Sequence, residues 1–360
     1  MLLDLAYHPE LPKDKSKGIA IVGAGEIVRA SHLPAYRLAE FHVVGIYDVD
    51  QPKARSVAEA FDLPNVFESL EELLACNDID IVDIAIPAQY QPDVVKKAVA
   101  KGKHVLCQKP LAASFKEATD IVEACQRAGV KGAVNQQMRW SPGIRASHEI
   151  IKKGWLGELT QATIQVNVKT DFAQWPWIAV QDQIEVMYHS IHYMDAIRFL
   201  YGTPEYIYAD GAKYPGQAVK GETRTMIHMK FPGEVKRGLI HDNHNNWADE
   251  DDWFATFRFE GTDGIIKGTN GALYNYPVGT SDTLSFLSKK LDESCWIKPV
   301  LEGKWFPHAF MGPMAELMRA IDNDEEPENS VSDNLLTLKM LFAAYRSMAE
   351  NRPVYLDDIQ

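Results

Sequence analysis

The chain has 360 residues, more than one hydrophobic core commonly fills, so its length predicts two domains. A formal net charge of -13, from 37 basic and 50 acidic residues spread along the chain, argues against nucleic-acid and anionic-membrane partners. The four cysteines show neither a CxxC pair nor a zinc-ligand spacing, as expected of reduced thiols in a cytoplasmic protein.

Residues 1–17 are predicted to be an N-terminal extension. Their short apolar patch contains Asp4 and follows no basic segment, so it does not resemble a signal peptide. No later apolar run is long enough to span a bilayer, and we therefore expect no membrane partner.

Residues 18–140 alternate short apolar strands with amphipathic helices. Such nearly continuous apolar strands are typical of a parallel sheet that helices cover on both faces. Ser69 and Ser114, each with a glutamate three residues later, form capping boxes at two helix starts. The pattern predicts a doubly wound α/β domain with a Rossmann-type sheet, its strands at 18–22, 42–47, 79–86, 103–108 and 130–135.

Residues 141–360 are predicted to form a second domain of the α+β class. After a helix at about 141–154, the apolar residues alternate with period two in long segments, which indicates a large, mostly antiparallel open sheet. Three further helices are expected near 182–202, 308–322 and 331–350, and the last is a candidate to pack back on the first domain.

A glycine loop follows the first predicted strand. Gly23 and Gly25 fall where a strand turns into a helix, a position at which backbone N–H groups and the helix dipole bind a pyrophosphate. Glu26 and Ile27 continue this loop as candidate cofactor contacts. The third position of the fingerprint is Val28 rather than glycine or alanine, which weakens the match.

Asp48 follows the second predicted strand at the spacing of a ribose-binding acid. A carboxylate there hydrogen-bonds the 2′-hydroxyl of NAD and repels the 2′-phosphate of NADP, so the sequence favours NAD. The alternative is that Asp48 and Asp50 only cap the helix that follows.

Four segments together resemble one known family. They read GAGEIVRASHLPA, DIDIVDIAIPAQYQPDVVKKAVAKGKHVLCQKPLA, NQQMRWSP and YHSIHYMDAIRFLYG. This pattern is similar to that of the Gfo/Idh/MocA oxidoreductases, which include sugar and inositol dehydrogenases, and it extends over nearly the whole chain from residue 18. The segment KGKHVLCQKPLA is its most specific element.

The resemblance implies that Lys109 is catalytic, lies beside the nicotinamide and contacts the reacting substrate oxygen, while Pro110 holds it in place. An ammonium at the carboxyl end of a parallel strand would stabilise developing alkoxide charge during hydride transfer. The alternative is a surface lysine that merely ends a strand. Pro87 and Gln108 are further candidate cofactor contacts.

The chain departs from the family pattern at four places. Gln108 replaces the usual glutamate before the lysine, and Val28 replaces a glycine. The segment from Pro87 to Gln91 lacks the usual asparagine and histidine. Tyr188 stands where the DxxxH helix of the family has aspartate.

A polar stripe follows the predicted helix at 182–202. Its members are Glu185, Tyr188, His189, His192 and Asp195, which recur at helical spacing on one face. A histidine has the proton affinity that a base needs near neutral pH, so His192 is the candidate base, with Tyr188 assisting. His189 is either a packing histidine or a substrate contact, and Asp195 is expected to brace its neighbours.

Other polar and aromatic residues are weaker candidates. Trp175 and Trp177, in a predicted loop, offer stacking faces to a sugar or alternatively cover the core. Arg139, in the family segment NQQMRWSP, is a candidate substrate ligand. His241, Asp242 and His244 have a metal-like spacing, but no matching ligands are apparent elsewhere in the sequence, so we expect no metal site.

These features predict an NAD-dependent dehydrogenase that oxidises a sugar or cyclic polyol. An aldose, such as a pentose of the apiose type, would give a lactone. The alternatives are a glycosidase that uses NAD without net redox change, a catalytically silent NAD-binding regulator, and a reductase of a non-sugar carbonyl or imine. The resemblance also implies a homodimer or homotetramer.

Overall fold

The computed structural model describes residues 5–275 and 278–360, and the chain divides into two compact units. The first, called here the parallel-sheet unit, comprises residues 9–140 and 306–335. The second, called here the large-sheet unit, comprises the described residues up to His8, those within 141–305, and 336–360. The predicted extension at 1–17 is described from Leu5 onward.

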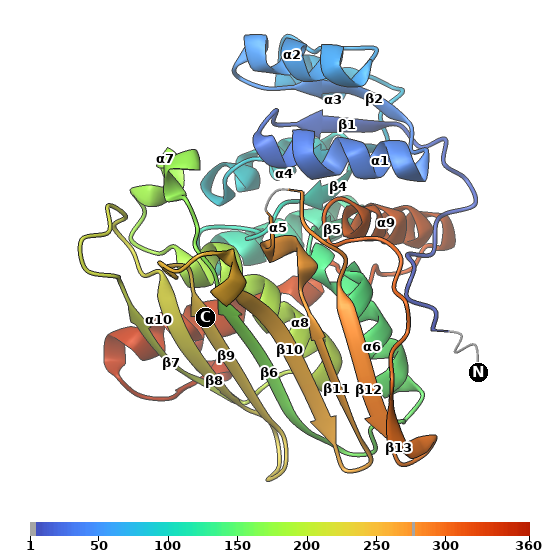
Figure 1. Ribbon diagram of the computed structural model, residues 1–360. Coiled ribbons are helices and arrows are strands. Elements are labelled where there is room, and N and C mark those ends of the chain that lie inside the picture. Colours follow the sequence, from blue (N-terminus) through green and yellow to red (C-terminus); the bar gives the residue numbers. More distant parts are fainter. Residues whose placement is uncertain (1–4, 276–277) are drawn as a thin grey trace. The chain divides into compact units, whose positions relative to one another are not determined.

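The parallel-sheet unit contains the predicted doubly wound sheet, with the order β2-β1-β3-β4-β5 and every neighbouring pair parallel (Figure 1). The strand order reverses between β1 and β3, and this reversal creates the crevice in which such sheets bind ligands. Its strands are β1 (Ile19–Val22), β2 (Val43–Tyr47), β3 (Ile81–Ile84), β4 (His104–Cys107) and β5 (Gly132–Val134).

Helices connect these strands, and the predicted capping residues begin two of them. The Ser69 hydroxyl accepts from the N–H of Glu72 at 3.1 Å, and the Ser114 hydroxyl accepts from the N–H of Glu117 at 3.2 Å. The helices of this unit are α1 (Leu33–Ala39), α2 (Gln51–Phe61), α3 (Leu70–Ala75), α4 (Gln91–Ala100), α5 (Phe115–Ala128) and α9 (Met311–Asn323), with the short turns η1 (Val28–His32, a π-helix), η2 (Ala88–Tyr90), η3 (Gln137–Trp140) and η8 (His308–Phe310).

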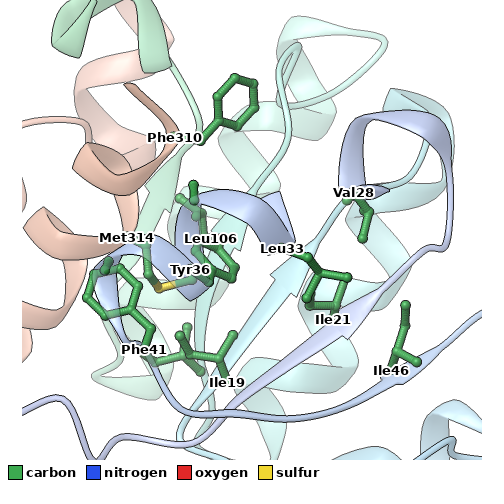
Figure 2. Packing of buried hydrophobic residues seen from close by; sticks show 14 of the residues in the cluster. Ile19, Ile21, Val28, Leu33, Tyr36, Phe41, Ile46, Leu106, Phe310 and Met314 are labelled. Carbon is green, nitrogen blue, oxygen red and sulfur yellow. The ribbon is translucent and has the colours of Figure 1, made fainter. Parts of the chain in front are cut away.

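Helix α9 comes late in the chain yet completes the core of the parallel-sheet unit. Met314 of α9, with Phe310 of the preceding turn η8, is buried in the same apolar cluster as Tyr36 of α1 and Leu106 of β4 (Figure 2). Leu317 of α9 also belongs to this cluster. This burial explains why residues 306–335 belong to the unit whose strands end near residue 134.

The large-sheet unit contains a mostly antiparallel sheet with the order β13-β12-β11-β10-β6-β9-β8-β7-β14, in which β6 and β9 pair in parallel (Figure 1). The predicted alternation is present, since β8 buries every second residue. The strands are β6 (Leu159–Asn167), β7 (Tyr206–Ala212), β8 (Arg224–Lys230), β9 (Arg237–Asn243), β10 (Phe254–Gly261), β11 (Gly264–Thr269), β12 (Thr283–Ser288), β13 (Asp292–Ile297) and β14 (Val354–Tyr355).

Two helices of this unit, α6 and α8, pack against the sheet and against each other. The other face leaves Tyr208, Met226 and Leu239 exposed on adjacent strands. The helices are α6 (Pro142–Lys152), α7 (Pro176–Ala179), α8 (Ile191–Tyr201) and α10 (Val331–Glu350, whose first turn belongs to the parallel-sheet unit), with the short turns η4 (Phe172–Gln174), η5 (Val186–Ser190, a π-helix), η6 (Glu250–Asp252), η7 (Gly271–Leu273) and η9 (Leu356–Asp358).

No helix in the described parts of the chain combines the length and apolar character that crossing a bilayer requires.

The role of α9 in the core can be tested by a pair of leucine truncations. Leu317→Ala should lower the free energy of unfolding by about 3 kcal/mol, because it opens a cavity at a fully buried position. The matched control Leu38→Ala, on the exposed side of α1, should change it by less than about 1 kcal/mol. Urea unfolding of the full chain measures both, and equal effects would contradict this assignment of α9.

Candidate active-site residues

The glycine loop after β1 has the backbone geometry that a pyrophosphate site needs. Gly23 adopts φ +112°, and a Cβ there would lie 2.4 Å from the carbonyl oxygen of Ala85. A Cβ on Gly25 would meet no atom within 4 Å, so open space adjoins the backbone at that point. Val28, where the fingerprint has its third glycine, is fully buried in the core and packs the turn against the sheet.

Three other predicted cofactor contacts lie around this loop. Glu26 is exposed, and Ile27 is half-buried against the core of the unit. Pro87 lies just beyond β3, where it precedes η2 and is half-buried. All three thus lie at the carboxyl ends of β1 and β3, the two strands that flank the reversal in strand order.

Asp48 has a structural role at the end of β2. Its carboxylate accepts from the N–H of Ala24 at 2.7 Å and from the N–H of Asp50 at 2.8 Å. Asp50, in turn, caps α2 by accepting from the N–H of Lys53. The capping alternative therefore holds for Asp50, whereas Asp48 fixes the glycine loop and stays half-exposed, with lone pairs left for a ribose.

Lys109 lies two residues beyond the end of β4 and is partly buried. Its backbone N–H donates to Oε1 of Gln108 at 2.8 Å, and the peptide bond between Lys109 and Pro110 is cis. Burial lowers the pKa of the Lys109 ammonium from 10.5 to about 7. A lysine with this pKa exchanges its proton near neutral pH, which is the property that acid–base chemistry at a hydroxyl requires.

A buried histidine connects the strand ends around Lys109. His32 Nδ1 donates to Asp83 at 2.7 Å, which leaves Nε2 to accept from the side-chain amides of Gln108 at 3.2 Å and Asn135 at 3.1 Å. Tyr36 also donates to Asp83, at 2.8 Å. Because Asp83 lies on β3, and Gln108 and Asn135 follow β4 and β5, one imidazole ties three strands together next to Lys109.

Gln91 is a second supporting residue that the sequence analysis missed. Its buried side-chain amide donates to the carbonyl oxygens of Gln108 and Pro110, at 2.8 Å each, and so brackets the backbone of Lys109. His32 and Gln91 share one feature that the sequence does show. Each is a polar residue among apolar ones in the helical segment that follows a strand, β1 for His32 and β3 for Gln91.

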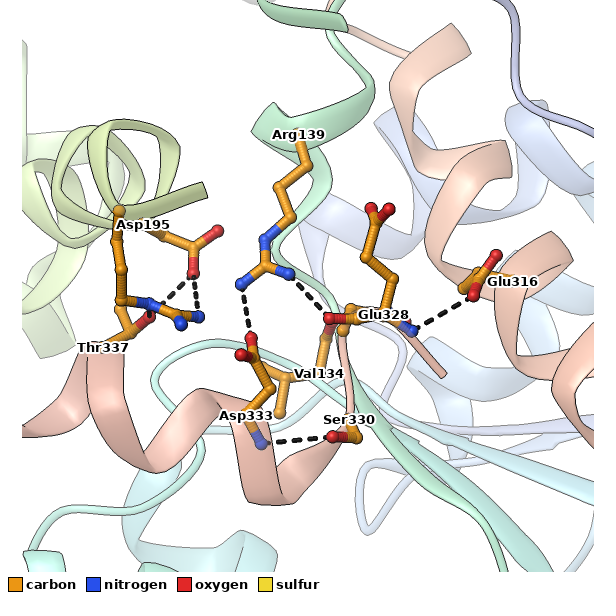
Figure 3. Close-up of polar contacts among 10 residues, drawn as sticks. Val134, Arg139, Asp195, Glu316, Glu328, Ser330, Asp333 and Thr337 are labelled. Carbon is orange, nitrogen blue, oxygen red and sulfur yellow. Dashed lines mark hydrogen bonds and ion pairs between the residues drawn. The ribbon is translucent and has the colours of Figure 1, made fainter. Parts of the chain in front are cut away.

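The predicted substrate role of Arg139 is not favoured by its surroundings. The side chain is 2% exposed, and its guanidinium donates to the carbonyl oxygen of Glu328 at 2.7 Å and pairs with Asp333 at 2.7 Å (Figure 3). All three residues belong to the parallel-sheet unit. Arg139 links η3 to the start of α10, a pairing of distant segments that the sequence pattern does not reveal.

The polar stripe of the large-sheet unit is divided by a π-helical turn. Tyr188 and His189 lie in η5 and are half-buried, whereas His192 is the second residue of α8 and is 7% exposed. The His192 ring packs edge-on against Trp305 at 5.4 Å between centroids. Burial also raises the pKa of Tyr188, so that its hydroxyl remains a hydrogen-bond donor.

The two acids of the stripe do not share the half-exposed position of Tyr188. Asp195 is buried and accepts from Thr337 at 2.7 Å, the bracing role that was expected (Figure 3). Glu185 is also fully buried and accepts from both the N–H and the hydroxyl of Ser190. The wider π-helical turn shifts the register by one residue, which the α-helical spacing used for the prediction does not capture.

The two predicted tryptophans lie beside Tyr188. Trp177 is 42% exposed and meets the Tyr188 ring edge-on at 5.4 Å between centroids, while Trp175 packs partly against the small apolar cluster of Phe172 and Ile178. Trp177 therefore keeps an open face of the kind that stacks on a sugar ring, and Trp175 mainly covers its cluster.

Two residues of the metal-like loop meet the stripe inside the large-sheet unit. Glu185, His189 and His244 bring one ligand-capable atom each within 4.8 Å of one another. Asp242 lies next to them, with Oδ1 3.0 Å from His244 Nε2. The sequence shows no further ligands for this loop and so predicts no metal site, whereas the structure brings Glu185 and His189 beside His244.

Burial is the main cause of the shifted pKa values of Glu185, Asp242 and His244. The pKa of Glu185 is raised well above its usual value by burial and by the negative charge of Asp242. Burial raises the pKa of Asp242 to about 7 and lowers that of His244 to about 4. Two buried carboxyl groups and a neutral imidazole are thus adjacent, with no cation among the described residues of the group to balance a negative charge.

Comparison with known proteins identifies both parts of the chain. Residues 17–136 match the profile described as the oxidoreductase family with an NAD-binding Rossmann fold, and residues 144–276 match the Gfo/Idh/MocA C-terminal domain. Together these matches cover well over half of the chain.

Individual relatives are similar over different lengths. D-apiose dehydrogenase of Paraburkholderia graminis is 26% identical over 347 residues, covering 95% of this chain and 90% of the relative. The 2,7-anhydro-N-acetylneuraminate hydratase of Escherichia coli is 27% identical over 232 residues, covering 62% and 58%. The crystal structure of an Agrobacterium radiobacter oxidoreductase with NAD+, L-tartaric acid and magnesium has a TM-score of 0.83 at 20% identity, covering 96% and 100% of the two chains.

The lowered pKa of Lys109 makes a prediction about stability. Between pH 7 and 10.5 the unfolded chain binds a proton at this lysine that the folded chain does not, so the cost of burying the ammonium is greatest below pH 7 and disappears as the pH rises toward 10.5. Lys109→Met should therefore stabilise the cofactor-free protein at pH 6 by about 2 kcal/mol, a figure reduced from 1.36 kcal/mol per pKa unit because the side chain is partly solvated.

Urea unfolding at pH 6 and pH 10 measures the effect. The exposed Lys101→Met is the matched control and should change stability by less than about 0.5 kcal/mol at both pH values. A Lys109→Met gain that is absent at pH 6, or that does not shrink at pH 10, would show that the lysine is not desolvated.

Proposed function

The chain belongs to the Gfo/Idh/MocA oxidoreductases, and on that premise we propose that it is an NAD-dependent dehydrogenase that oxidises an alcohol of a sugar or cyclic polyol. The observation that carries the proposal is Lys109, a partly desolvated lysine at the carboxyl end of a parallel strand in an NAD-binding sheet. Burial lowers the pKa of Lys109 by more than three units, which brings it near neutral pH. A lysine that transfers a proton benefits from such a pKa, whereas a lysine with a purely structural role does not.

In the proposed reaction the substrate C–H bond breaks and its hydride reduces NAD+ to NADH. The hydroxyl proton passes to His192, and a carbonyl forms at the same carbon, so that one alcohol and one NAD+ give one carbonyl, one NADH and one proton. Lys109 donates a hydrogen bond to the reacting oxygen and stabilises its alkoxide character. Tyr188 donates to the same oxygen or orients the ring.

An aldose is the favoured substrate class, and its oxidation at the anomeric carbon would give a lactone. The open face of Trp177 and the hydroxyl group of half-buried Tyr188 suit a hydroxylated ring. The similarity to D-apiose dehydrogenase, over 95% of this chain at 26% identity, supports a pentose such as apiose as the first substrate to test.

A redox-neutral use of NAD is the second candidate. It is favoured by one observation, the similarity to a relative named a hydratase rather than a dehydrogenase. In such a reaction transient oxidation activates the sugar and the hydride returns to it, so no NADH accumulates. The same Lys109 and His192 would serve both reactions.

Oligomeric state remains a prediction of a homodimer or homotetramer. The apolar residues Tyr208, Met226 and Leu239 on the exposed side of the large sheet support it, because such a patch is commonly covered by a partner.

The proposal is tested by mixing the purified protein with NAD or NADP and a panel of aldoses, sugar acids and inositols. NADH absorbance should rise with one substrate class, and Lys109→Ala should lower kcat/KM by about 100-fold to 1,000-fold through the lost hydrogen bond to the alkoxide. His192→Asn should cost about 100-fold or more by removing the base.

The matched control Lys101→Ala, on the turn before β4, should leave turnover unchanged. Silence across the whole panel, with NAD bound to the purified protein, would contradict net oxidation. It would favour the redox-neutral reaction or a silent NAD-binding regulator instead, and sugar release without NADH would separate these two.

Cofactor choice is tested separately at Asp48. Asp48→Asn keeps an acceptor oxygen for the N–H of Ala24 but removes the charge that repels a 2′-phosphate. The ratio of kcat/KM for NADP to that for NAD should rise by about tenfold, the effect of about 1.4 kcal/mol. Asp50→Asn, whose residue only caps α2, should leave the ratio unchanged, and an unchanged ratio in both variants would remove Asp48 from cofactor recognition.

A further inference from the structure

A cluster of ligand-type side chains lies within the large-sheet unit. Glu185 immediately precedes the π-helical turn η5 and His189 lies within it, while Asp242 is the second-last residue of β9 and His244 follows that strand. Glu185, Asp242 and His244 are each no more than 1% exposed. The imidazole rings of His189 and His244 face each other with 4.0 Å between centroids.

Asp242 is a buried acid that lies against a second one. Its carboxyl group is hydrogen-bonded to the Glu185 carboxyl group and to the backbone of Asn243, neither of which brings a positive charge. Its Oδ1 lies 3.0 Å from His244 Nε2, without hydrogen-bond geometry between the two atoms. Buried carboxylates are ordinarily hydrogen-bonded, ion-paired or bound to a metal, because an uncompensated buried charge is costly. A bound cation would satisfy both atoms at once.

The surrounding hydrogen bonds orient these groups as outer-shell contacts orient metal ligands. Thr170 Oγ1 lies 2.6 Å from His244 Nδ1, which leaves Nε2 as the nitrogen available to a cation. Ser190 donates to Oε1 of Glu185 at 2.7 Å, and Thr225 donates to Oε2 of the same carboxylate. Oε1 also accepts from the N–H of Ser190, whereas Oε2 retains a second lone pair for a ligand bond.

We propose that Glu185, His189 and His244 bind a divalent transition-metal ion of the Zn2+ class, with Asp242 as the fourth ligand. Two imidazoles and two carboxylates form a donor set that suits such an ion better than Mg2+ or Ca2+, which prefer oxygen alone. Ligand bonds of about 2 Å place tetrahedral donors roughly 3.4 Å apart, so atoms now within 4.8 Å would close by about an ångström. The two carboxylate charges would balance the charge of the ion.

The bound ion has a structural role. Four protein ligands complete a tetrahedral set and leave no position for substrate. The ion would join the end of β9 to η5, the turn that carries Tyr188, and would thereby fix the start of α8. This inference stands apart from the proposed function, since metal binding is measured without cofactor or substrate.

The test uses the full-length protein after removal of metals with EDTA. Equilibrium dialysis against Zn2+, followed by metal analysis, should give one tightly held ion per chain, whereas Mg2+ should not compete at a hundredfold excess. Co2+ should give the visible absorption bands of a tetrahedral site with nitrogen ligands, a readout that needs no variant.

Two variants localise the ion. His244→Asn and the isosteric Glu185→Gln should each weaken Zn2+ binding by about 100-fold or more. Loss of an outer-shell contact commonly costs about 10-fold to 100-fold in metal affinity, and loss of a direct ligand should cost at least as much as the upper end of that range. His241→Asn is the matched control: it lies on the same strand as Asp242, one residue earlier, so its side chain points to the opposite face of the sheet. It should change affinity less than threefold.

Thermal unfolding checks that the variants fold. Saturating Zn2+ should raise Tm of the wild-type protein and of His241→Asn, and should not raise Tm of His244→Asn or Glu185→Gln. The proposal is overturned if wild-type protein binds no stoichiometric Zn2+, if Co2+ gives only an octahedral spectrum, or if binding survives in both ligand variants.

Discussion

The aligned carboxyl ends of the parallel strands are the constraint on which the candidate chemistry depends. Backbone bonds link each end to the next: the N–H of Gly23 donates to Tyr47, that of Ala85 to Val22 and that of Gln108 to Ile84. Buried His32 adds a side-chain tie from Asp83 to the amides after β4 and β5. Gly23, Asp48, Pro87 and Lys109 can therefore hold fixed positions although they are far apart in sequence, because a rigid sheet edge positions the loops that follow it.

This rigidity allows a lysine to be kept in an unfavourable environment. Burial disfavours the Lys109 ammonium, and the backbone around it is held by Gln91 and by the side chain of Gln108 rather than by an opposing charge on the residue before it. Gln108 accepts from the N–H of Lys109 without adding a negative charge that would raise the lysine pKa. Stability given up at a candidate catalytic group is the usual trade between function and folding.

In the large-sheet unit, the candidate polar residues lie along one continuous helical segment, η5 followed by α8, rather than at the ends of several strands. Residues at the π-helical turn η5 have different surroundings. Glu185, just before the turn, belongs to the buried group with Asp242 and His244, while Tyr188 within the turn remains half-exposed beside Trp177. Asp195 is directed to Thr337 of α10. Such turns are frequent at functional sites because a single extra residue changes which side chains share a face.

Local patterns in the sequence determined the strands and helices, the capping serines at 69 and 114, the glycine loop and Lys109, because each depends on residues close together in the chain. The family resemblance also rested on contiguous segments. Tertiary structure alone decided that α9 completes the parallel-sheet core, that Arg139 pairs with Asp333, that His32 reaches Asp83, and that His244 meets Glu185. The physical reason is that a side chain acquires its partners, its burial and its pKa from segments that only folding brings beside it, and no local periodicity records those partners.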